Sequence, residues 1–335
     1  MKVCMTTRCF DFRNAGIGRV SSEIMAGVKA RGHEIYPVAT EGSMSLYRYY
    51  YYVVWGIRKK LPQDCEVYHA LTPMETLWTP KKKTVVTFHD LFLLTDPDRV
   101  GGGFGYNDLK RDIGREFFKN VCRVAVTSRI IVCVSEKTRQ EVLSFFKVPE
   151  SKVRVIRSGI NQSLNYQPRL PNGKFRIGYL GGLDRRKRVN LLVETFKATR
   201  GNTELVIGGT GLDERILKNM AKGDHRIKFL GLVPDEDLCS FYNSLDLFAF
   251  PSAVEGYGLP PIEAMACKVP IVVLADSLMP HEVKSRCIEV NSPSQMIIPW
   301  ELSETQLEDN YQFAKSHDWN KCVDEYIKLY EEVAR

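Results

Sequence analysis

The sequence predicts an α/β protein made of two doubly wound domains, each a parallel sheet covered by helices. In both halves of the 335 residues, short apolar runs alternate with segments of helical periodicity, which is the order of elements from which parallel sheets are built. A polar segment with two prolines and a glycine, residues 161–174, separates the halves. We therefore expect one domain over residues 1–167 and a second over 168–317.

Three short apolar runs in the first half predict buried strands. They are Val3–Met5, Val85–Phe88 and Ile130–Val134. The segment Asn14–Arg19 follows the first run and begins a helix. Its backbone N–H groups around Gly16 and Gly18 lie at the positive end of that helix, where they suit a phosphate or an acceptor. The alternative interpretation is a tight turn that needs small residues.

Five apolar runs in the second half predict a second Rossmann-like sheet. They are Phe175–Leu180, Glu204–Ile207, Ile227–Leu230, Leu245–Phe250 and Ile271–Leu274. A helix is expected between the first two, near residues 189–199. Towards the end of the chain, apolar and aromatic residues recur at helical spacing and predict a terminal amphipathic helix over 318–335.

Two carboxylates, Glu255 and Glu263, stand eight positions apart across a predicted strand-to-helix turn. The glycines on either side of Tyr257 give the loop a backbone that can approach a ligand and point N–H groups at it. We expect Pro261 at the first helical position and Glu263 in the first turn. Such a pair suits a ligand with vicinal hydroxyls, such as a sugar or a ribose. The alternative is a solvated Glu255 and a Glu263 that only complements the helix dipole.

Four consecutive cations, Arg185 to Arg188, follow the first predicted strand of the second half. Arginine holds phosphate oxygens with a bidentate fork, and lysine adds a compact charge. The run therefore suits a diphosphate, and it would stabilise negative charge that grows on a leaving nucleotide. The alternative is a solvated basic surface.

His89 lies at the end of a predicted strand, at the edge where open α/β sheets bind ligands. Its ring can donate a hydrogen bond to a sugar hydroxyl or carbonyl. The alternative is a structural histidine at a strand end.

Two segments, Asp96–Asp98 and Asp235–Asp237, have the D-x-D spacing that some transferases use to hold a divalent ion. Asp235 follows a proline and precedes apolar residues at helical spacing, which predicts a helix N-cap with acids in the first turn. We therefore expect no metal site.

The nine cysteines are scattered without a CxxC pair, which argues against a disulfide framework or a zinc site and favours a reducing cytosol. No basic-then-apolar leader opens the sequence, and no apolar run has the length of a membrane span. We expect a cytoplasmic protein, either soluble or peripheral at the cytoplasmic face of a membrane.

Positive charge is concentrated in the first half of the chain. Residues 1–165 carry 26 Lys and Arg against 16 Asp and Glu, a net +10, and residues 166–335 carry 21 against 24, a net −3. This asymmetry indicates an anionic partner, such as a lipid surface or a phosphate-bearing acceptor, or else a solubilising surface bias. Residues 46–60 interleave aromatics with cations, as an interfacial segment or a helix packed on its own sheet would. Nucleic acid is not expected, because no binding module surrounds them.

The segment 250–267 resembles the Glu-x7-Glu motif of the retaining GT-B glycosyltransferases of family 4, the group 1 glycosyl transferases. The Arg-Lys pair of the cationic loop also matches the family, and the resemblance covers essentially the whole chain, most specifically residues 176–283. Two departures are visible. Lys268 stands where the family usually has glycine, and Gly182 stands where many members have arginine.

The resemblance implies a GT-B fold with two facing Rossmann-like domains, the active site in the interdomain cleft and the terminal helix packed back on the first domain. It implies catalytic roles for His89 on the transferred sugar, for Arg186 and Lys187 on the diphosphate, and for Glu255 on the sugar. The donor-binding residues that it implies are Gly16, Gly18, Gly209, Leu232, Gly256, Tyr257, Gly258, Leu259 and Glu263.

The activity implied by the resemblance is a retaining, metal-independent hexosyl transfer from a nucleotide-sugar to a glycan, lipid-linked or other hydroxyl acceptor, in polysaccharide or glycolipid synthesis. No cofactor is expected beside the donor substrate, for which the resemblance favours GDP-mannose over UDP-glucose. An anionic membrane surface is an expected partner of the basic half. The alternatives are a GT-B-like epimerase or phosphorylase, and an inactive GT-B scaffold.

Overall fold

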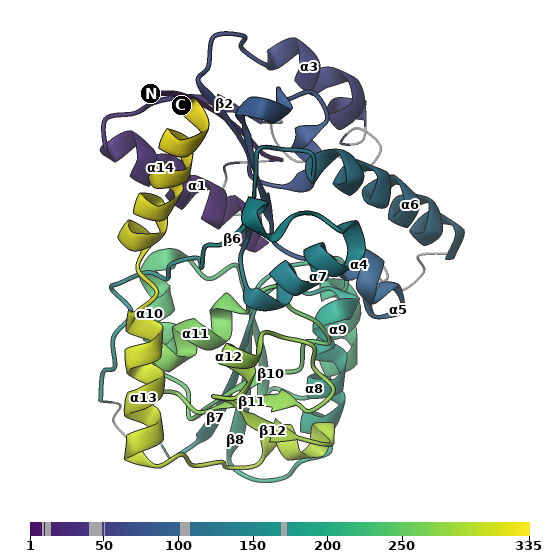
Figure 1. The fold of residues 1–335 in the computed structure, drawn as a ribbon. Coiled ribbons are helices and arrows are strands. Elements are labelled where there is room, and N and C mark those ends of the chain that lie inside the picture. The colour runs from purple at the N-terminus through teal and green to yellow at the C-terminus, as the bar shows by residue number, and fades with distance from the viewer. Residues whose placement is uncertain (9, 11–14, 40–48, 50, 101–107, 169–172) are drawn as a thin grey trace. The chain divides into compact units, whose positions relative to one another are not determined.

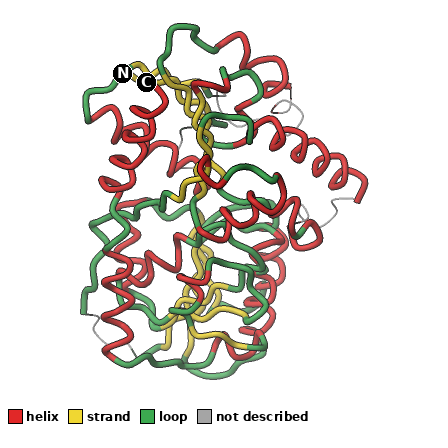
Figure 2. The backbone as a smooth tube through the Cα atoms, viewed as in Figure 1, coloured by secondary structure: helices red, strands yellow, loops and turns green. Residues whose placement is uncertain are grey.

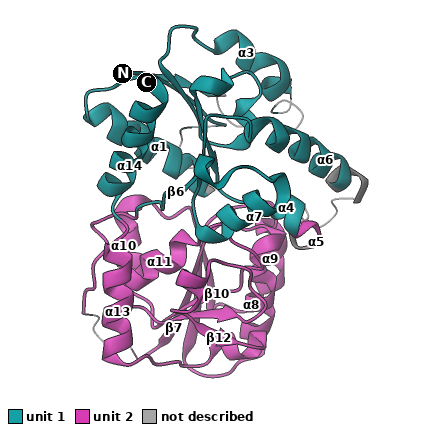
Figure 3. Ribbon diagram, in the orientation of Figure 1, with its two compact units in different colours: residues 1–95, 112–159, 318–335 teal, residues 96–111, 160–317 magenta. Residues whose placement is uncertain are grey.

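The computed structural model describes the chain except for residues 9, 11–14, 40–48, 50, 101–107 and 169–172 (Figure 1). The chain divides into two compact units (Figure 3). Unit 1 comprises Met1–Thr95, Asp112–Gly159 and Asp318–Arg335, and unit 2 comprises Asp96–Arg111 and Ile160–His317. These bounds differ from the expected domains by residues 96–111 and 160–167, which belong to unit 2.

Unit 1 is built on a six-stranded sheet in the order β2-β1-β3-β4-β5-β6, and every neighbouring pair is parallel. The strands of both units are yellow in Figure 2. The central strands β3, β4 and β5 are buried along their whole length, as strands covered on both faces should be. The strands are β1 (Lys2–Thr6), β2 (Glu34–Val38), β3 (Val67–Ala70), β4 (Thr84–Phe88), β5 (Ile130–Cys133) and β6 (Val153–Val155).

The helices that accompany this sheet include long segments and single turns. They are α1 (Ala15–Ala30), α3 (Ile57–Lys60), α4 (Phe92–Thr95), α6 (Asp108–Ala125), α7 (Glu136–Phe146) and α14 (Trp319–Ala334), with η1 (Tyr52–Gly56), η2 (Pro73–Thr76), η3 (Lys81–Lys83) and η4 (Glu150–Lys152). Among the described helices, none combines the length and the apolar composition needed to cross a lipid bilayer.

The last helix, α14, is part of unit 1, and its apolar face is buried there. It comes close to α1, because a Cβ atom at Gly27 would lie 2.5 Å from Cγ2 of Val323. The buried ring of His69 in β3 bonds the Tyr330 hydroxyl at 2.6 Å and the Thr87 hydroxyl at 2.9 Å. The amphipathic helix expected over 318–335 is therefore present.

Unit 2 is built on a second six-stranded parallel sheet, in the order β12-β11-β10-β7-β8-β9. Its strands are β7 (Phe175–Leu180), β8 (Thr203–Gly208), β9 (Ile227–Gly231), β10 (Leu247–Phe250), β11 (Ile271–Leu274) and β12 (Ile288–Val290). Its helices and turns are α5 (Pro97–Val100), η5 (Arg185–Lys187), α8 (Val189–Lys197), α9 (Glu214–Ala221), η6 (Asp235–Asp237), α10 (Leu238–Asn243), α11 (Leu259–Ala266), α12 (His281–Lys284), η7 (Pro293–Ile297) and α13 (Glu304–Lys315).

Two predictions about helix starts are wrong. Helix α11 begins at Leu259 rather than Pro261, so Glu263 lies in its second turn. The cause is Gly258, whose positive φ of +95° ends the loop, after which two prolines fix helical φ angles where no N–H is needed. Asp235 is not an N-cap, because it opens the 3-10 turn η6, and α10 follows from Leu238.

Candidate active site

The sheet of unit 2 has a topological switch point between β7 and β10. From β7 the chain continues to β8 and β9 on one side, whereas β10, β11 and β12 lie on the other side. In open parallel sheets, ligands bind in the crevice at the carboxyl ends of the strands that flank such a point. The cationic loop follows β7 and the Glu255 loop follows β10, so the topology brings both predicted segments to one crevice.

Lys187 and Glu255 form a buried ion pair at this crevice. The Lys187 Nζ lies 2.5 Å from Oε1 of Glu255, and both residues are 7% exposed. Nη1 of Arg186 lies 3.3 Å from Oε2 of the same carboxylate, and the Ser252 hydroxyl donates to Oε1. Both carboxylate oxygens are therefore engaged, and the three charged side chains leave an excess of positive charge.

The pair is electrostatically coupled. Burial alone would raise the pKa of Glu255, but the charges of Lys187 and Arg186 hold it below its usual range. Burial and the neighbouring Arg186 lower the pKa of Lys187, and the Glu255 carboxylate opposes that shift. A ligand that brought further negative charge would favour the charged lysine, as a diphosphate would.

Hydrogen bonds to main-chain carbonyls hold the Glu255 loop in place. Nη1 of Arg186 donates to the carbonyl of Val254 at 2.7 Å, and the N–H of Ala253 donates to the carbonyl of Arg186 at 2.8 Å. The N–H of Glu255 donates to the carbonyl of Leu278 at 2.9 Å. The position of the carboxylate is thus set by main-chain contacts as well as by its cations.

Arg188 stabilises the same loop through its side chain. Its own backbone is left-handed, with φ +51°. Its Nη1 and Nη2 donate to the two carboxylate oxygens of Asp276 at 2.8 and 3.0 Å. Its Nε donates to the carbonyl of Pro251 at 2.8 Å, and Nη2 reaches that of Ser252 at 3.3 Å. A non-glycine residue costs about 1 kcal/mol in this conformation, a cost that these contacts offset. Of the four cations, Arg188 is therefore committed to the loop itself.

Glu263 is held by a separate contact. It is 3% exposed in α11 and accepts a hydrogen bond of 2.8 Å at Oε2 from the hydroxyl of Tyr242 in α10. Tyr242 is itself fully buried. The carboxylate of Glu263 is thus oriented by α10, and its binding to the same ligand as Glu255 stays a prediction.

The side chain of Tyr257, in the loop before α11, is buried. The Tyr257 ring is 6% exposed, and its hydroxyl bonds Nε2 of His317. Nδ1 of His317 donates in turn to the carbonyl of Phe313 at 2.8 Å. The ring belongs to the core of unit 2, so a donor contact from Tyr257 would have to come from its main chain, and the donor contacts of residues 256–259 stay predictions.

Gly209 holds the loop after β8 against the loop after β7. Its φ is +118°, and a Cβ atom there would lie 1.9 Å from the carbonyl oxygen of Gly181. Next to it, the N–H of Leu183 donates to the carbonyl of Thr210 at 2.9 Å. Leu232 follows β9 and is 48% exposed. Gly209 therefore has a packing requirement of its own, and donor contacts from Gly209 and Leu232 stay predictions.

His89, Gly16 and Gly18 lie in unit 1. Nε2 of His89 is 2.9 Å from the carbonyl of Leu71, and because a carbonyl only accepts, Nδ1 is left as a hydrogen-bond acceptor. Burial lowers the pKa of His89 to about 4, although the bond to Leu71 opposes this. The ring is thus neutral at physiological pH, and it would accept rather than donate at Nδ1. Gly16 and Gly18 lie within the first turns of α1.

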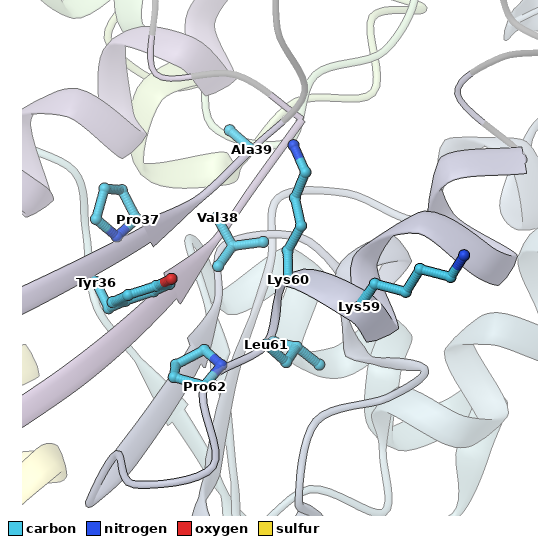
Figure 4. Close-up of a pocket in the computed structure, with 8 residues that line it drawn as sticks. All are labelled: Tyr36, Pro37, Val38, Ala39, Lys59, Lys60, Leu61 and Pro62. Carbon is cyan, nitrogen blue, oxygen red and sulfur yellow. The ribbon is translucent and has the colours of Figure 1, made fainter.

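Cavities lined by described residues also lie outside the predicted site. One of about 480 Å³ lies in unit 1 between β2 and the end of α3, where the Lys60 side chain extends towards Ala39 and Lys59 extends away (Figure 4). Another, of about 360 Å³, lies in unit 2 and includes Asp246 and Lys268. Its lining residues precede β7, β10 and β11, so it opens at the edge opposite to the switch-point crevice.

Four residues of the site were not found from the sequence: Ser252, Asp276, Tyr242 and His317. Three of them reach their partners across long separations in the chain, and no local spacing reports such contacts. The contact of Ser252 could have been predicted, because a serine hydroxyl three residues before a carboxylate can form a local hydrogen bond with it.

Two family models match the chain. The model described as glycosyl transferases group 1 matches residues 162–292, and the model described as Glycosyltransferase Family 4 matches residues 15–164. Together they cover parts of both units, and the first of them includes the switch-point crevice of unit 2.

Similar proteins are found among curated sequences and solved structures. The O-antigen chain mannosyltransferase B of Escherichia coli is 26% identical over 82% of this chain and 81% of its own length. The sucrose-phosphate synthase structure from Thermosynechococcus elongatus aligns with a TM-score of 0.75 at 16% identity, over 99% of both chains. The Anabaena HepE structure in complex with UDP and glucose aligns with a TM-score of 0.71 at 14% identity, over 99% of this chain and 100% of that one.

Proposed function

Because the chain belongs to the group 1 glycosyltransferases of the GT-B type, we propose that it moves a hexose from a nucleotide-sugar donor to a hydroxyl group of a glycan or lipid-linked acceptor. The observation that carries this proposal is the buried Lys187–Glu255 ion pair, with Arg186 beside it, at the switch-point crevice of unit 2. Cations placed where a parallel sheet binds ligands suit the diphosphate of such a donor.

In the proposed complex, Arg186 and Lys187 bind the diphosphate, Glu263 binds ribose hydroxyls, and Glu255 binds the sugar together with the main chain of 256–259. In the free protein Glu255 neutralises part of the charge of its two cations. The incoming diphosphate would share these cations, which would free one carboxylate oxygen for a sugar hydroxyl. His89 would accept a hydrogen bond from the transferred sugar at Nδ1.

We propose that transfer retains the anomeric configuration without a protein nucleophile and without a metal ion. The contacts of Glu255 support the absence of a protein nucleophile, because Lys187, Ser252 and Arg186 engage both of its oxygens in the free protein, and the oxygen that the donor would free is taken by a sugar hydroxyl. A carboxylate held in this way is a poor nucleophile. The donor phosphate would instead accept the proton of the acceptor hydroxyl on the face from which the nucleotide leaves, while the cations stabilise the departing charge.

For the donor, GDP-mannose and UDP-glucose are the two candidates, and we favour GDP-mannose. The Escherichia coli relative is named as a mannosyltransferase, which supports mannose. The Anabaena structure contains UDP and glucose, which supports the other candidate, although only the fold is shared at that level of identity.

A panel of nucleotide-sugars tests the proposal directly. A donor present at 100 times its dissociation constant should add about 2.7 kcal/mol to the free energy of unfolding. The donor that stabilises most would then be incubated with alkyl glycosides, and the anomeric configuration of any product would be read by NMR coupling constants. Stabilisation followed by an inverted product would overturn retention. Absence of stabilisation by every donor would favour an inactive scaffold.

We also propose that unit 1 associates with an anionic membrane surface at the cytoplasmic face. Tyr51 is 62% exposed and Trp55 is 58% exposed, and both are followed by the cations of α3. Trp78 joins this surface, since its Nε1 donates to the carbonyl of Val54 at 2.9 Å and the Arg58 guanidinium lies 4.9 Å from its ring. Exposed aromatics beside cations suit the headgroup region of anionic lipids.

Vesicle co-sedimentation tests this surface. Wild-type protein should bind vesicles of phosphatidylcholine with 30% phosphatidylglycerol, a composition chosen to be anionic, at about tenfold lower lipid concentration than phosphatidylcholine alone. The Trp55→Ser variant should lose most of that preference. Equal binding to both vesicle types would contradict the proposal.

A further inference from the structure

The sheet of unit 1 has a switch point as well, between β1 and β3. From β1 the chain continues to β2 on one side, whereas β3 and β4 lie on the other side. The carboxyl ends of β1 and β3 therefore flank a crevice of the kind that binds ligands in open parallel sheets. Arg8 follows β1 by two residues, and Thr72 and Glu75 follow β3. The transfer described above uses none of these three residues.

Glu75 is fully buried at this point and is held by two hydroxyl groups. The Tyr49 hydroxyl donates to its Oε1 at 2.6 Å, and the Thr72 hydroxyl donates to its Oε2. Tyr49 and Thr72 are 7% and 8% exposed, so the carboxyl group is enclosed by its partners. Burial raises the pKa of Glu75 to about 7, although both hydroxyls oppose the shift. A buried carboxyl group is costly unless it is well bonded, as this one is.

The contacts of Glu75 fix the ring of Tyr49, and this ring supports Arg8. The Arg8 guanidinium lies 5.0 Å from the centroid of the Tyr49 ring, while Arg8 itself is exposed. Glu75 thus orients Tyr49 through its hydroxyl, and the Tyr49 ring contacts the guanidinium of Arg8, which follows the carboxyl end of β1. The side chain of Arg8 is positioned by a buried polar network rather than by solvent alone.

We propose that Arg8 binds an oxyanion carried by the acceptor, either a phosphate or a carboxylate, and that Tyr49 and Glu75 are positioning residues for it. A guanidinium is suited to this task, because its planar fork matches phosphate and carboxylate oxygens. The net charge of +10 over residues 1–165 favours an anionic substrate on the same side. The inference rests on the proposed transfer reaction for the identity of the ligand as an acceptor.

Binding of small anions to the full-length protein tests the proposal without any turnover. The protein is first saturated with GDP or UDP, whichever stabilises it, so that the cations of unit 2 are occupied. Phenyl phosphate, benzoate and the neutral benzyl alcohol are then titrated by ligand-observed NMR. We expect phenyl phosphate or benzoate to bind at least tenfold more tightly than benzyl alcohol, and the tighter of the two identifies the oxyanion.

The Arg8→Gln variant should weaken binding of that anion at least tenfold and leave the binding of benzyl alcohol unchanged. Arg129→Gln is the matched control, because Arg129 is an exposed arginine of the same unit. It precedes β5 and so lies at the amino ends of the strands, opposite to the carboxyl ends of β1 and β3. The Arg129→Gln variant should bind as the wild type does. Tyr49→Phe keeps the ring but removes the hydrogen bond to Glu75. It should therefore weaken binding of the anion about threefold without changing the stabilisation by GDP or UDP.

Wild-type affinity for both anions in Arg8→Gln would overturn the proposal, and so would equal binding of anions and benzyl alcohol by the wild type. The test separates this inference from the proposed function. If anions bind at Arg8 but no sugar is transferred, the reaction is wrong and the oxyanion site stands. If sugar is transferred but Arg8→Gln binds anions normally, the reaction stands and the site is wrong.

Discussion

The ammonium group of Lys187 lies 2.5 Å from the carboxylate of Glu255, and both side chains are enclosed within unit 2. Two charges withdrawn from water in this way depend on each other, because each provides the solvation that the other has lost. The pair is therefore part of the stability of unit 2 as well as of the proposed donor site, and the two contributions can be separated by experiment.

Replacement of Lys187 by methionine should destabilise the protein by about 3 kcal/mol, since it leaves Glu255 buried beside a single cation. It should also reduce kcat/KM for transfer at least 100-fold. The double variant Lys187→Met with Glu255→Gln should recover most of the stability and none of the activity. Urea denaturation measures the first effect and initial rates measure the second.

The control for this variant is Lys218→Met, which removes an exposed pair with Glu214 on α9. Its free energy of unfolding should stay within about 0.5 kcal/mol of the wild type. If the double variant were less stable than Lys187→Met alone, the coupling between the two charges would be disproved.

Arg188 and Lys268 provide a matched pair of left-handed residues, with φ +51° and +53°. Arg188→Gly relieves about 1 kcal/mol of backbone strain but removes the contacts to Asp276 and to the loop after β10. We expect a nearly unchanged midpoint of unfolding and a dissociation constant for the donor that rises about tenfold. Isothermal titration with the donor would measure it.

Lys268→Gly relieves the same strain at a position away from the switch-point crevice. The contact that it removes is the ion pair between Nζ of Lys268 and Oε2 of Glu308, 2.8 Å apart. Donor affinity should not change. If both glycine variants bound donor equally well, Arg188 would have no role in positioning the loop.

Much of the fold could be predicted because buried parallel strands are apolar along their length. The runs at 175–180 and 271–274 match β7 and β11, and the other predicted runs overlap observed strands. Three of the four strands that were missed, β2, β6 and β12, are only partly buried, whereas β3 is buried along its whole length. β2, β6 and β12 are edge strands, β6 and β12 have three residues each, and β3 contains a histidine whose ring bonds the last helix.

The candidate site was predicted unevenly for a similar reason. The motif around Glu255 and the cations at Arg186 and Lys187 are local in sequence, and the topology brings them together. Their direct ion pair was not predicted, because it joins residues that are 68 positions apart. The left-handed conformation of Lys268 explains physically why glycine is usual there in the family that the sequence resembles.

Glu75 should give the protein a measurable pH dependence of stability. Its pKa rises from 4.5 to about 7 on folding, because the carboxyl group is buried. The folded protein therefore holds a proton that the unfolded chain releases between these values. Stability from this group is complete below pH 4.5 and is lost as the pH rises through 7, a loss of about 3 kcal/mol.

The variant Glu75→Gln removes that titration and keeps an acceptor for the Tyr49 hydroxyl. The difference in free energy of unfolding between wild type and variant should thus change by about 3 kcal/mol between pH 4.5 and 8, in favour of the variant at the higher pH. Urea denaturation at several pH values measures it. A difference that stayed constant with pH would mean that Glu75 keeps an ordinary pKa.

Gly209 and Gly201 separate the effect of backbone conformation from that of close packing. Their φ angles are +118° and +120°, so alanine is strained at both positions. A Cβ atom at Gly201 meets nothing within 4 Å, whereas one at Gly209 would lie 1.9 Å from the carbonyl oxygen of Gly181. Gly201→Ala should therefore cost about 1 kcal/mol. Gly209→Ala should cost about 3 kcal/mol, because the loops after β7 and β8 must move apart.

The movement in Gly209→Ala should also reach the cations. The loop after β7 continues from Gly181 into Arg186 and Lys187, so a displaced loop changes the position of the ion pair with Glu255. We expect donor affinity to fall at least tenfold in Gly209→Ala and to stay at the wild-type value in Gly201→Ala, as measured by isothermal titration. Equal affinity in both variants would show that close packing at Gly209 does not control the geometry of the cationic loop.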